Sequence, residues 1–77
     1  MVFLAITQAG LAQALQTARA DDAIWCGADA IGDTEYLDLG DARLNRFIYG
    51  LGGRVPDDAL DTIREHHPGQ TIWIEAT

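Results

Sequence analysis

Three short apolar runs along the chain predict three strands of a buried sheet. The first run, Met1 to Ile6, is continuous and rich in Val, Phe and Ile, which is typical of a strand buried on both faces. The second run is Ala23 to Cys26, and the third is Gln70 to Ala76, where two isoleucines flank a tryptophan. Because β-branched and aromatic residues favour extended structure, each run is expected to form a strand.

The stretch between the first two runs has the spacing of a helix. Leu11, Leu15 and Ala18 recur at i, i+4 and i+7, and most of their neighbours are good helix formers. Thr7 stands where a helix N-cap is expected, because its hydroxyl can accept a free backbone N–H. We therefore expect a helix over Gln8 to Ala20. A crossover of this length allows the two flanking strands to pair in parallel.

A second helix is expected over Val55 to His67. Leu60 and Ile63 give it an apolar stripe, and Pro56 suits its first turn. Its acids gather near the start and its basic residues near the end, as the helix dipole favours. The Pro68–Gly69 pair then ends the helical pattern.

The middle of the chain has a weaker pattern. Gly27 to Leu39 holds two glycines and four acids, and we expect a loop with one helical turn. Asp41 is placed to cap a short helix over Ala42 to Arg46. Arg46 to Leu51 is a β-branched and aromatic run closed by glycines, which favours a strand at 46–51. A helix is the alternative there, because four apolar residues also recur at helical spacing: Leu44, Phe47, Ile48 and Leu51.

These elements follow the order β-α-β-(irregular)-β-α-β within a single small α/β domain over residues 1–77. The alternation indicates a small, mostly parallel sheet of about four strands with two main helices, and a mixed sheet is the alternative. Two helices do not cover both faces of such a sheet. Part of an apolar face or edge is therefore expected to be open and to contact another molecule.

The composition is that of a folded protein with an acidic surface. The 77 residues are 48% hydrophobic and 22% charged, which excludes an acidic disordered tail. Five Arg, no Lys and twelve acids give a net charge of −7. Because this charge repels phosphate, neither nucleic acid nor anionic membrane is expected as a direct partner. A basic protein, or a second copy of the chain in a homodimer, is expected instead.

Two features bear on the compartment. The single cysteine, Cys26, cannot form an internal disulfide, so nothing indicates an oxidising environment. The apolar N-terminal run is interrupted at Thr7 and follows no basic region, unlike a secretory signal. No stretch reaches the roughly 20 apolar residues of a membrane-spanning helix. We therefore expect a cytoplasmic protein.

Residues with reactive side chains are expected near the carboxyl ends of the first two strands: Thr7, Cys26, Asp29 and Asp33. Active sites of parallel sheets gather at that edge, so these four define a candidate pocket. Residues 27–34 also have the outline G-x-x-x-x-G-x-T, but a phosphate loop needs Lys where Asp33 stands. The acids lack the spacing of a calcium loop as well. No metal or cofactor is therefore expected.

A nucleophilic Cys26 would need a nearby base or positive charge to lower its pKa. The only imidazoles belong to His66 and His67, at the end of the last predicted helix. In a parallel α/β layout that helix end lies near the amino ends of the strands, away from Cys26. A buried structural thiol is thus the favoured interpretation.

Two further features are candidates for partner binding. Asp57, Asp61 and Glu65 recur at i, i+4 and i+8, which lines up three carboxylates that would suit an Arg-rich or Lys-rich partner. Trp25 and Trp73 lie in predicted strands, and they become the centre of a contact patch if their face lacks a helix. An ordinary solvated helix face and an ordinary core are the alternatives.

The sequence therefore predicts a small, acidic, non-catalytic protein-interaction or regulatory module that associates with itself. No catalytic residue is assigned. One alternative is an acidic protein that mimics nucleic acid and thereby inhibits a basic protein. The other is a small enzyme that depends on the thiol or on the acidic loop.

Overall fold

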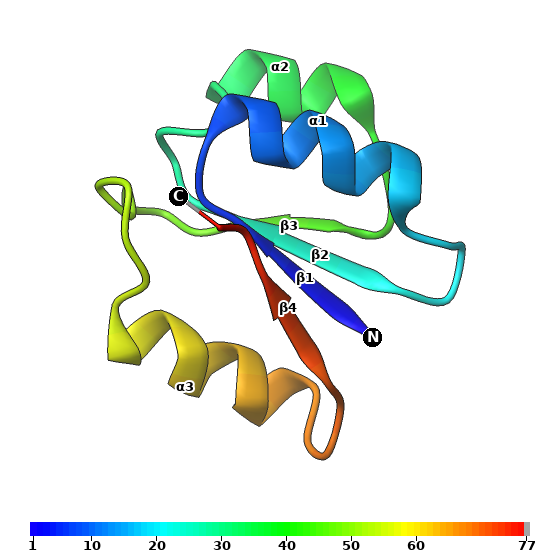
Figure 1. Ribbon diagram of the computed structural model, residues 1–77. Helices are drawn as coiled ribbons and strands as arrows, with labels where there is room; N and C mark the ends of the chain where they lie inside the picture. Colours follow the sequence, from blue (N-terminus) through cyan, green and yellow to red (C-terminus); the bar gives the residue numbers. More distant parts are fainter. Residues whose placement is uncertain (77) are drawn as a thin grey trace.

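The computed structural model describes residues 1–76, which form four strands and three helices (Figure 1). The elements in chain order are β1 (Val2–Ala5), α1 (Gln8–Thr17), β2 (Ala23–Cys26), α2 (Asp33–Leu39), β3 (Leu44–Arg46), α3 (Asp57–His66) and β4 (Ile72–Ile74). The predicted α/β class with a parallel sheet is confirmed. The predicted strand over Ala23 to Cys26 is confirmed with its bounds.

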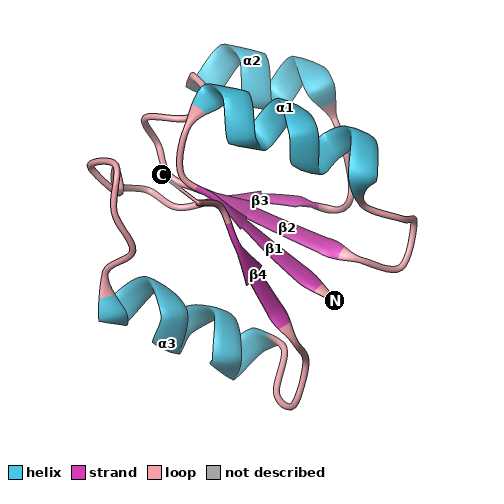
Figure 2. Ribbon diagram, in the orientation of Figure 1, coloured by secondary structure: helices cyan, strands magenta, loops and turns pink. Residues whose placement is uncertain are grey.

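All four strands are parallel, and their order across the sheet is β3-β2-β1-β4. The chain moves outward from β1 through β2 to β3, then returns across the sheet to place β4 on the other side of β1. Because crossovers between parallel strands keep one hand, this reversal puts α3 on the opposite face from α1 and α2, as Figure 2 shows. The switch in direction lies between β1 and β4.

The core has two layers, one on each face of the sheet. Alternate residues of β1 point to opposite faces, so Phe3 packs on the α1 side while Val2 and Leu4 pack on the α3 side. Leu11 and Ala14 of α1 belong to the first layer. The second layer is completed by residues of β2, α3 and the loop before it: Trp25, Phe47, Leu51, Ala59 and Ile63.

The helix α2 is additional to the two main helices that were predicted, and it lies in the stretch where one helical turn was expected. Its core-facing contact is Tyr36, and none of its residues is fully buried. The helix is stabilised at its ends instead. Asp33 and Glu35 lie in its first turn, where the helix dipole favours negative charge. Gly40 ends it in the left-handed conformation, with φ of 57°.

Two predictions for the following stretch are wrong. The strand is β3, at Leu44–Arg46, rather than 46–51, and it replaces the short helix expected over Ala42 to Arg46. The apolar residues after β3 do not form a strand. Phe47 and Leu51 belong to an irregular loop, and each packs its side chain into the core separately. Ile48 between them is 95% exposed, so the run has no strand-like alternation against the core.

The helix α1 ends three residues before its predicted end. Ala18 takes an extended conformation, with ψ of 146°, and stops the helix. The guanidinium of Arg43 donates to the carbonyl oxygens of Ala18, at 2.7 Å, and of Leu15, at 3.2 Å. These bonds satisfy carbonyls that a helix end leaves without partners. Arg43 thereby ties the end of α1 to the start of β3.

No helix within residues 1–76 has both the length and the apolar character needed to cross a membrane.

Removing part of the Ile63 side chain tests the α3 side of the core. Ile63 is fully buried, so Ile63→Ala is expected to lower the free energy of unfolding by about 3 kcal/mol, through lost burial and a residual cavity. Leu37→Ala is the control, since Leu37 is 75% exposed on α2 and its truncation should change stability by less than about 0.5 kcal/mol. Urea unfolding measures both, and equal effects would contradict this packing.

Candidate functional site

The four residues of the candidate pocket lie near the carboxyl edge of the sheet, but they do not line one cavity. Thr7 follows β1, Cys26 ends β2, Asp29 lies in the next loop and Asp33 begins α2. Two grooves lie on the surface of the described residues, and none of the four residues lines either of them. Each has its own partners, described below.

Thr7 caps α1 as predicted, and it also binds a carboxylate that the sequence did not reveal. Its hydroxyl accepts the N–H of Gly10 at 3.1 Å and donates to Oε2 of Glu75. The backbone N–H groups of Ile6 and Thr7 donate to Oε1 of Glu75, at 2.6 and 2.8 Å. Glu75 follows β4, so its side chain bridges the ends of β1 and β4.

This carboxylate fills the position where open α/β sheets bind anions, at the switch in strand order and the start of a helix. Gly10 makes room for it, because a Cβ at residue 10 would collide with Oε1 and Cδ of Glu75. Burial opposes the charge on Glu75, but the hydrogen bonds from Thr7 and Ile6 outweigh burial and lower the pKa of the carboxyl. The chain thus supplies its own anion at the switch point.

Asp29 joins two loops at the same edge. Its carboxylate accepts the backbone N–H of Gly52 at 3.1 Å and that of Leu51 at 3.2 Å. These bonds, that of Gly52 foremost, lower the pKa of Asp29. Gly27 and Gly50 lie against the same side chain, where a Cβ would be crowded. Asp29 is therefore engaged in holding the loop before α3 against the loop after β2.

Asp33 is engaged by Arg46, the last residue of β3. The guanidinium forms an ion pair with Asp33 and donates to the carbonyl oxygens of Ile31, at 2.8 Å, and Ala28, at 3.1 Å. The loop after β2 is therefore wrapped around an arginine. Asp29 and Asp33 thus both hold these loops in place. No group of three or more side chains that could ligate a metal gathers in residues 1–76.

Cys26 lies in the core on the α1 side of the sheet, among apolar side chains. Burial raises the pKa of its thiol to about 11, and the nearby Arg46 offsets only part of this. His66 and His67 contact Trp25, which packs on the opposite face. The thiol and both imidazoles therefore lie on opposite faces of the sheet, and it is this difference in face, not a distance along the strands, that separates them.

Trp25 serves the core rather than a partner surface. It is 9% exposed, and its ring stacks on His66 with centroids 5.3 Å apart and an interplanar angle of 17°. Its indole Nε1 donates to Nε2 of His67 at 3.1 Å. Trp25 therefore holds the end of α3 against β2.

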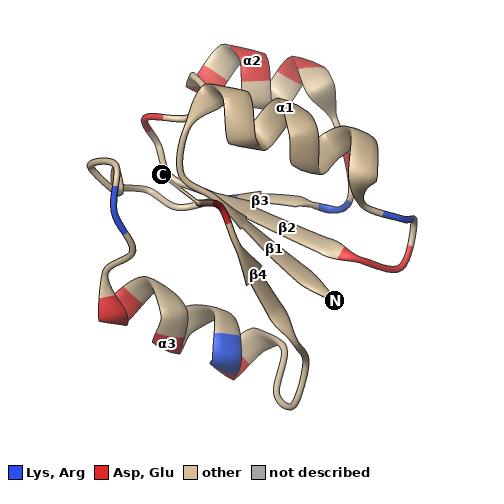
Figure 3. Cartoon of the chain, viewed as in Figure 1, with Lys and Arg blue, Asp and Glu red and all other residues tan. Residues whose placement is uncertain are grey.

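The acidic row of α3 is solvent-exposed. Asp57, Asp61 and Glu65 are all exposed, and Asp61 lies 3.6 Å from Arg64 on the same helix (Figure 3). The predicted row exists as a surface feature.

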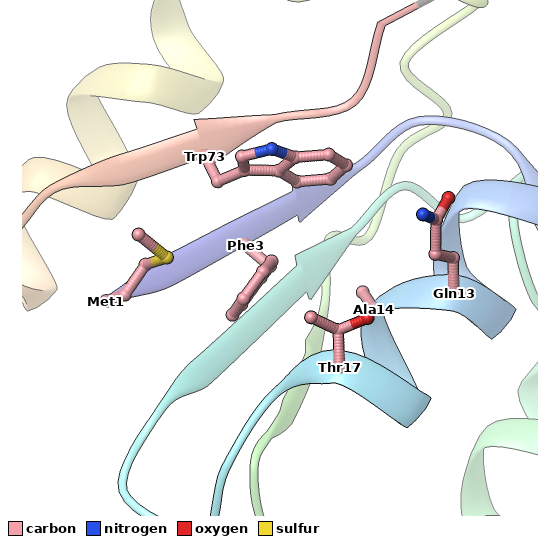
Figure 4. Close-up of a pocket in the computed structure, with 6 residues that line it drawn as sticks. All are labelled: Met1, Phe3, Gln13, Ala14, Thr17 and Trp73. Atoms are coloured by element: carbon pink, nitrogen blue, oxygen red, sulfur yellow. The ribbon is translucent and has the colours of Figure 1, made fainter.

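Trp73 lies in an open groove, unlike Trp25. It is 37% exposed and stands beside Phe3 on β1, with ring centroids 5.6 Å apart. The groove has a volume of about 320 Å³ and runs between β4 and the flank of α1 (Figure 4). Its lining residues are Met1, Phe3, Gln13, Ala14, Thr17 and Trp73, and we call this surface the α1–β4 face.

The chain matches no protein-family model, no curated protein and no solved structure. Function is therefore inferred from the geometry and charge of its own side chains.

Replacing Glu75 tests the carboxylate at the switch point. At neutral pH, Glu75→Gln is expected to cost about 1–2 kcal/mol, because hydrogen bonds to an ionised acceptor are replaced by weaker ones. The folded-state pKa lies below the ordinary 4.5, so the ionised carboxylate stabilises the fold above that pH. This stabilisation disappears as the pH falls through the folded-state value.

The difference between wild type and Glu75→Gln should therefore be largest near neutrality and shrink below about pH 4.5. Unfolding at a series of pH values measures it. Glu65→Gln is the control, since Glu65 is exposed on α3. A difference between wild type and Glu75→Gln that grew as the solution became more acidic would contradict the arrangement.

The Cys26 thiol should be almost unreactive in the folded protein. A pKa raised from 9.0 to about 11 leaves about 100-fold less thiolate near neutral pH, and burial slows access further. Labelling with iodoacetamide, measured by mass spectrometry, should be complete only after the protein is unfolded. The variant Leu37→Cys in a Cys26→Ala background places a thiol on the exposed side of α2 and should react at once. Rapid labelling of Cys26 in the folded protein would contradict this expectation and support the alternative of a thiol-dependent enzyme.

Proposed function

We propose that this chain is a non-catalytic interaction module that works by associating with a second copy of itself through the α1–β4 face. The observation that carries the proposal is the combination of exposed apolar side chains and absence of side-chain charge on one side of a strongly acidic molecule. Two arguments, one from charge and one from apolar exposure, support it.

The charge argument concerns where two copies can meet. Each carries −7, so contact between acidic surfaces costs repulsion. No charged side chain occurs in residues 2–18 or 68–74, the segments that supply most of the α1–β4 face. Figure 3 shows the acids on α2, α3 and the loops instead. The terminal amine of Met1 is paired with Asp22 at 3.3 Å.

The second argument is the amount of apolar surface in one place. Met1 is 49% exposed and Trp73 37%, and both line the groove. Tryptophan is enriched among residues that dominate binding energy at interfaces. The groove is lined by Phe3 and Trp73, and an exposed apolar groove of this kind favours a protein surface as its occupant. A basic partner would instead favour the acids on α3.

The thiol-enzyme alternative is weaker on this geometry. Cys26 is buried with a pKa raised to about 11, and both imidazoles lie on the other face of the sheet. Thr7, Asp29 and Asp33 are bound to other groups of the chain. The exposed row on α3 keeps the nucleic-acid mimic as the second candidate, to be tested by binding to a basic protein.

Sedimentation equilibrium over a range of concentrations tests self-association. The wild type is expected to form a dimer. Trp73→Asp is expected to shift the equilibrium to monomer, because it removes apolar area from the contact and places two like charges there. Gln13→Glu adds one carboxylate to the groove and should weaken the dimer about tenfold or more. Gln16→Glu makes the same change on α1 outside the groove lining and should not.

A second control concerns exposed apolar residues elsewhere. Leu37→Asp removes a leucine that is 75% exposed on α2 and should leave the dimer intact. A wild type that stays monomeric at the highest concentration, or a dimer insensitive to both groove variants, would refute the proposed function.

A further inference from the structure

The outer edge of β4 determines how two copies would pair, an inference that rests on the proposed function. β1 lies on one side of β4, and no strand of residues 1–76 lies on the other. The segment Gln70 to Ile74 contains no charge and no proline, the usual devices by which an edge strand avoids pairing with another chain. Its edge is therefore chemically open to a further strand.

The register with β1 shows which backbone groups point outward. Thr71 accepts the N–H of Val2 at 2.9 Å, and Glu75 donates to Leu4 at 3.0 Å, so both residues direct these groups toward β1. Successive residues of a strand direct their N–H and C=O groups to opposite sides. Trp73, paired with Phe3, therefore also faces β1. Ile72 and Ile74 direct their N–H and C=O groups to the open edge.

We propose that two copies join antiparallel along β4, about a two-fold axis at Trp73, into one continuous sheet. In this register Ile72 and Ile74 of one copy form hydrogen-bonded pairs with Ile74 and Ile72 of the second copy. The two Trp73 residues form a non-hydrogen-bonded pair, whose Cα atoms in such sheets are about 4.5 Å apart. A two-fold interface of this kind is self-complementary and closed.

The side chains fit this arrangement on both faces. Trp73 lies on the α1 side beside Phe3, so the two indoles meet there as a cross-strand aromatic pair, flanked by α1 of each copy. Ile72 lies on the α3 side, and alternation places Ile74 on that side too. The exposed Ile74 would therefore be covered by Ile72 of the second copy.

A proline at residue 74 tests the backbone pairing. Ile74→Pro removes an outward N–H while leaving the bonds to β1, a substitution that edge strands tolerate. It should abolish the dimer in sedimentation while the far-ultraviolet circular dichroism of the fold is retained. Ile74→Ala, which keeps the N–H but loses most of the side chain, is the matched control and should still dimerise. Loss of folded signal in Ile74→Pro would itself contradict the outward direction of this N–H.

A cysteine at residue 73 tests the position of the two-fold axis. In a Cys26→Ala background, the Trp73→Cys variant should form a disulfide between residue 73 of one copy and residue 73 of the second copy on mild oxidation. Cα atoms about 4.5 Å apart lie within disulfide range. Leu37→Cys in the same background carries its thiol on the exposed side of α2, away from β4, and should form no disulfide between copies. Absence of the disulfide at concentrations where the reduced Trp73→Cys variant itself sediments as a dimer would overturn this axis.

The outcomes separate this inference from the function on which it rests. A monomeric wild type removes both. A dimer that Trp73→Asp disrupts, but that Ile74→Pro and Ile74→Ala leave equally intact, keeps self-association and overturns the pairing of β4 edges.

Discussion

The return of the chain across β1 is the constraint on which the rest of the structure depends. Because β4 is added on the far side of β1, α3 must lie on the face opposite α1 and α2. The two helices on the first face connect β1 to β2 and β2 to β3, so they lie over that part of the sheet and not over β4. The part of that face formed by Phe3 and Trp73 lies beside α1 rather than beneath it, and the groove is the result.

The same return brings the ends of β1 and β4 together, and with them Thr7 and Glu75. In many open α/β folds this position is where a ligand anion is held by free backbone N–H groups. Here the chain places its own carboxylate on those groups, and Asp29 does the same for the N–H groups of Leu51 and Gly52. The polar groups at this edge thus hold the loops, while the apolar groove lies at the edge strand.

The sequence was sufficient where one local pattern determined one element. Helical spacing from Leu11 to Ala18 and the short apolar run ending at Cys26 gave α1 and β2, because the packing of these residues follows directly from their period. It was insufficient for α2, which depends on the acids of its first turn, on the glycine that ends it and on Tyr36 rather than on an apolar stripe. It also misplaced β3, since Phe47 and Leu51 are buried from a loop whose shape is set by distant contacts.

The candidate residues divide in the same way. Trp25 and Trp73 look alike in the sequence, as aromatic residues within apolar strands. Trp25 lies in β2 beneath α3 and is covered by two histidines, whereas Trp73 lies at the sheet edge next to the groove. Glu75 had no local signal at all, because its partners Ile6 and Thr7 are almost a full chain length away.

Hydrogen exchange at the amides of β4, followed by NMR at increasing protein concentration, examines the open edge at single-residue resolution. The account predicts that the amides of Ile72 and Ile74 become protected as concentration rises, while the Trp73 amide, bonded to β1 in either state, changes little. Unprotected Ile72 and Ile74 amides at every concentration would contradict it.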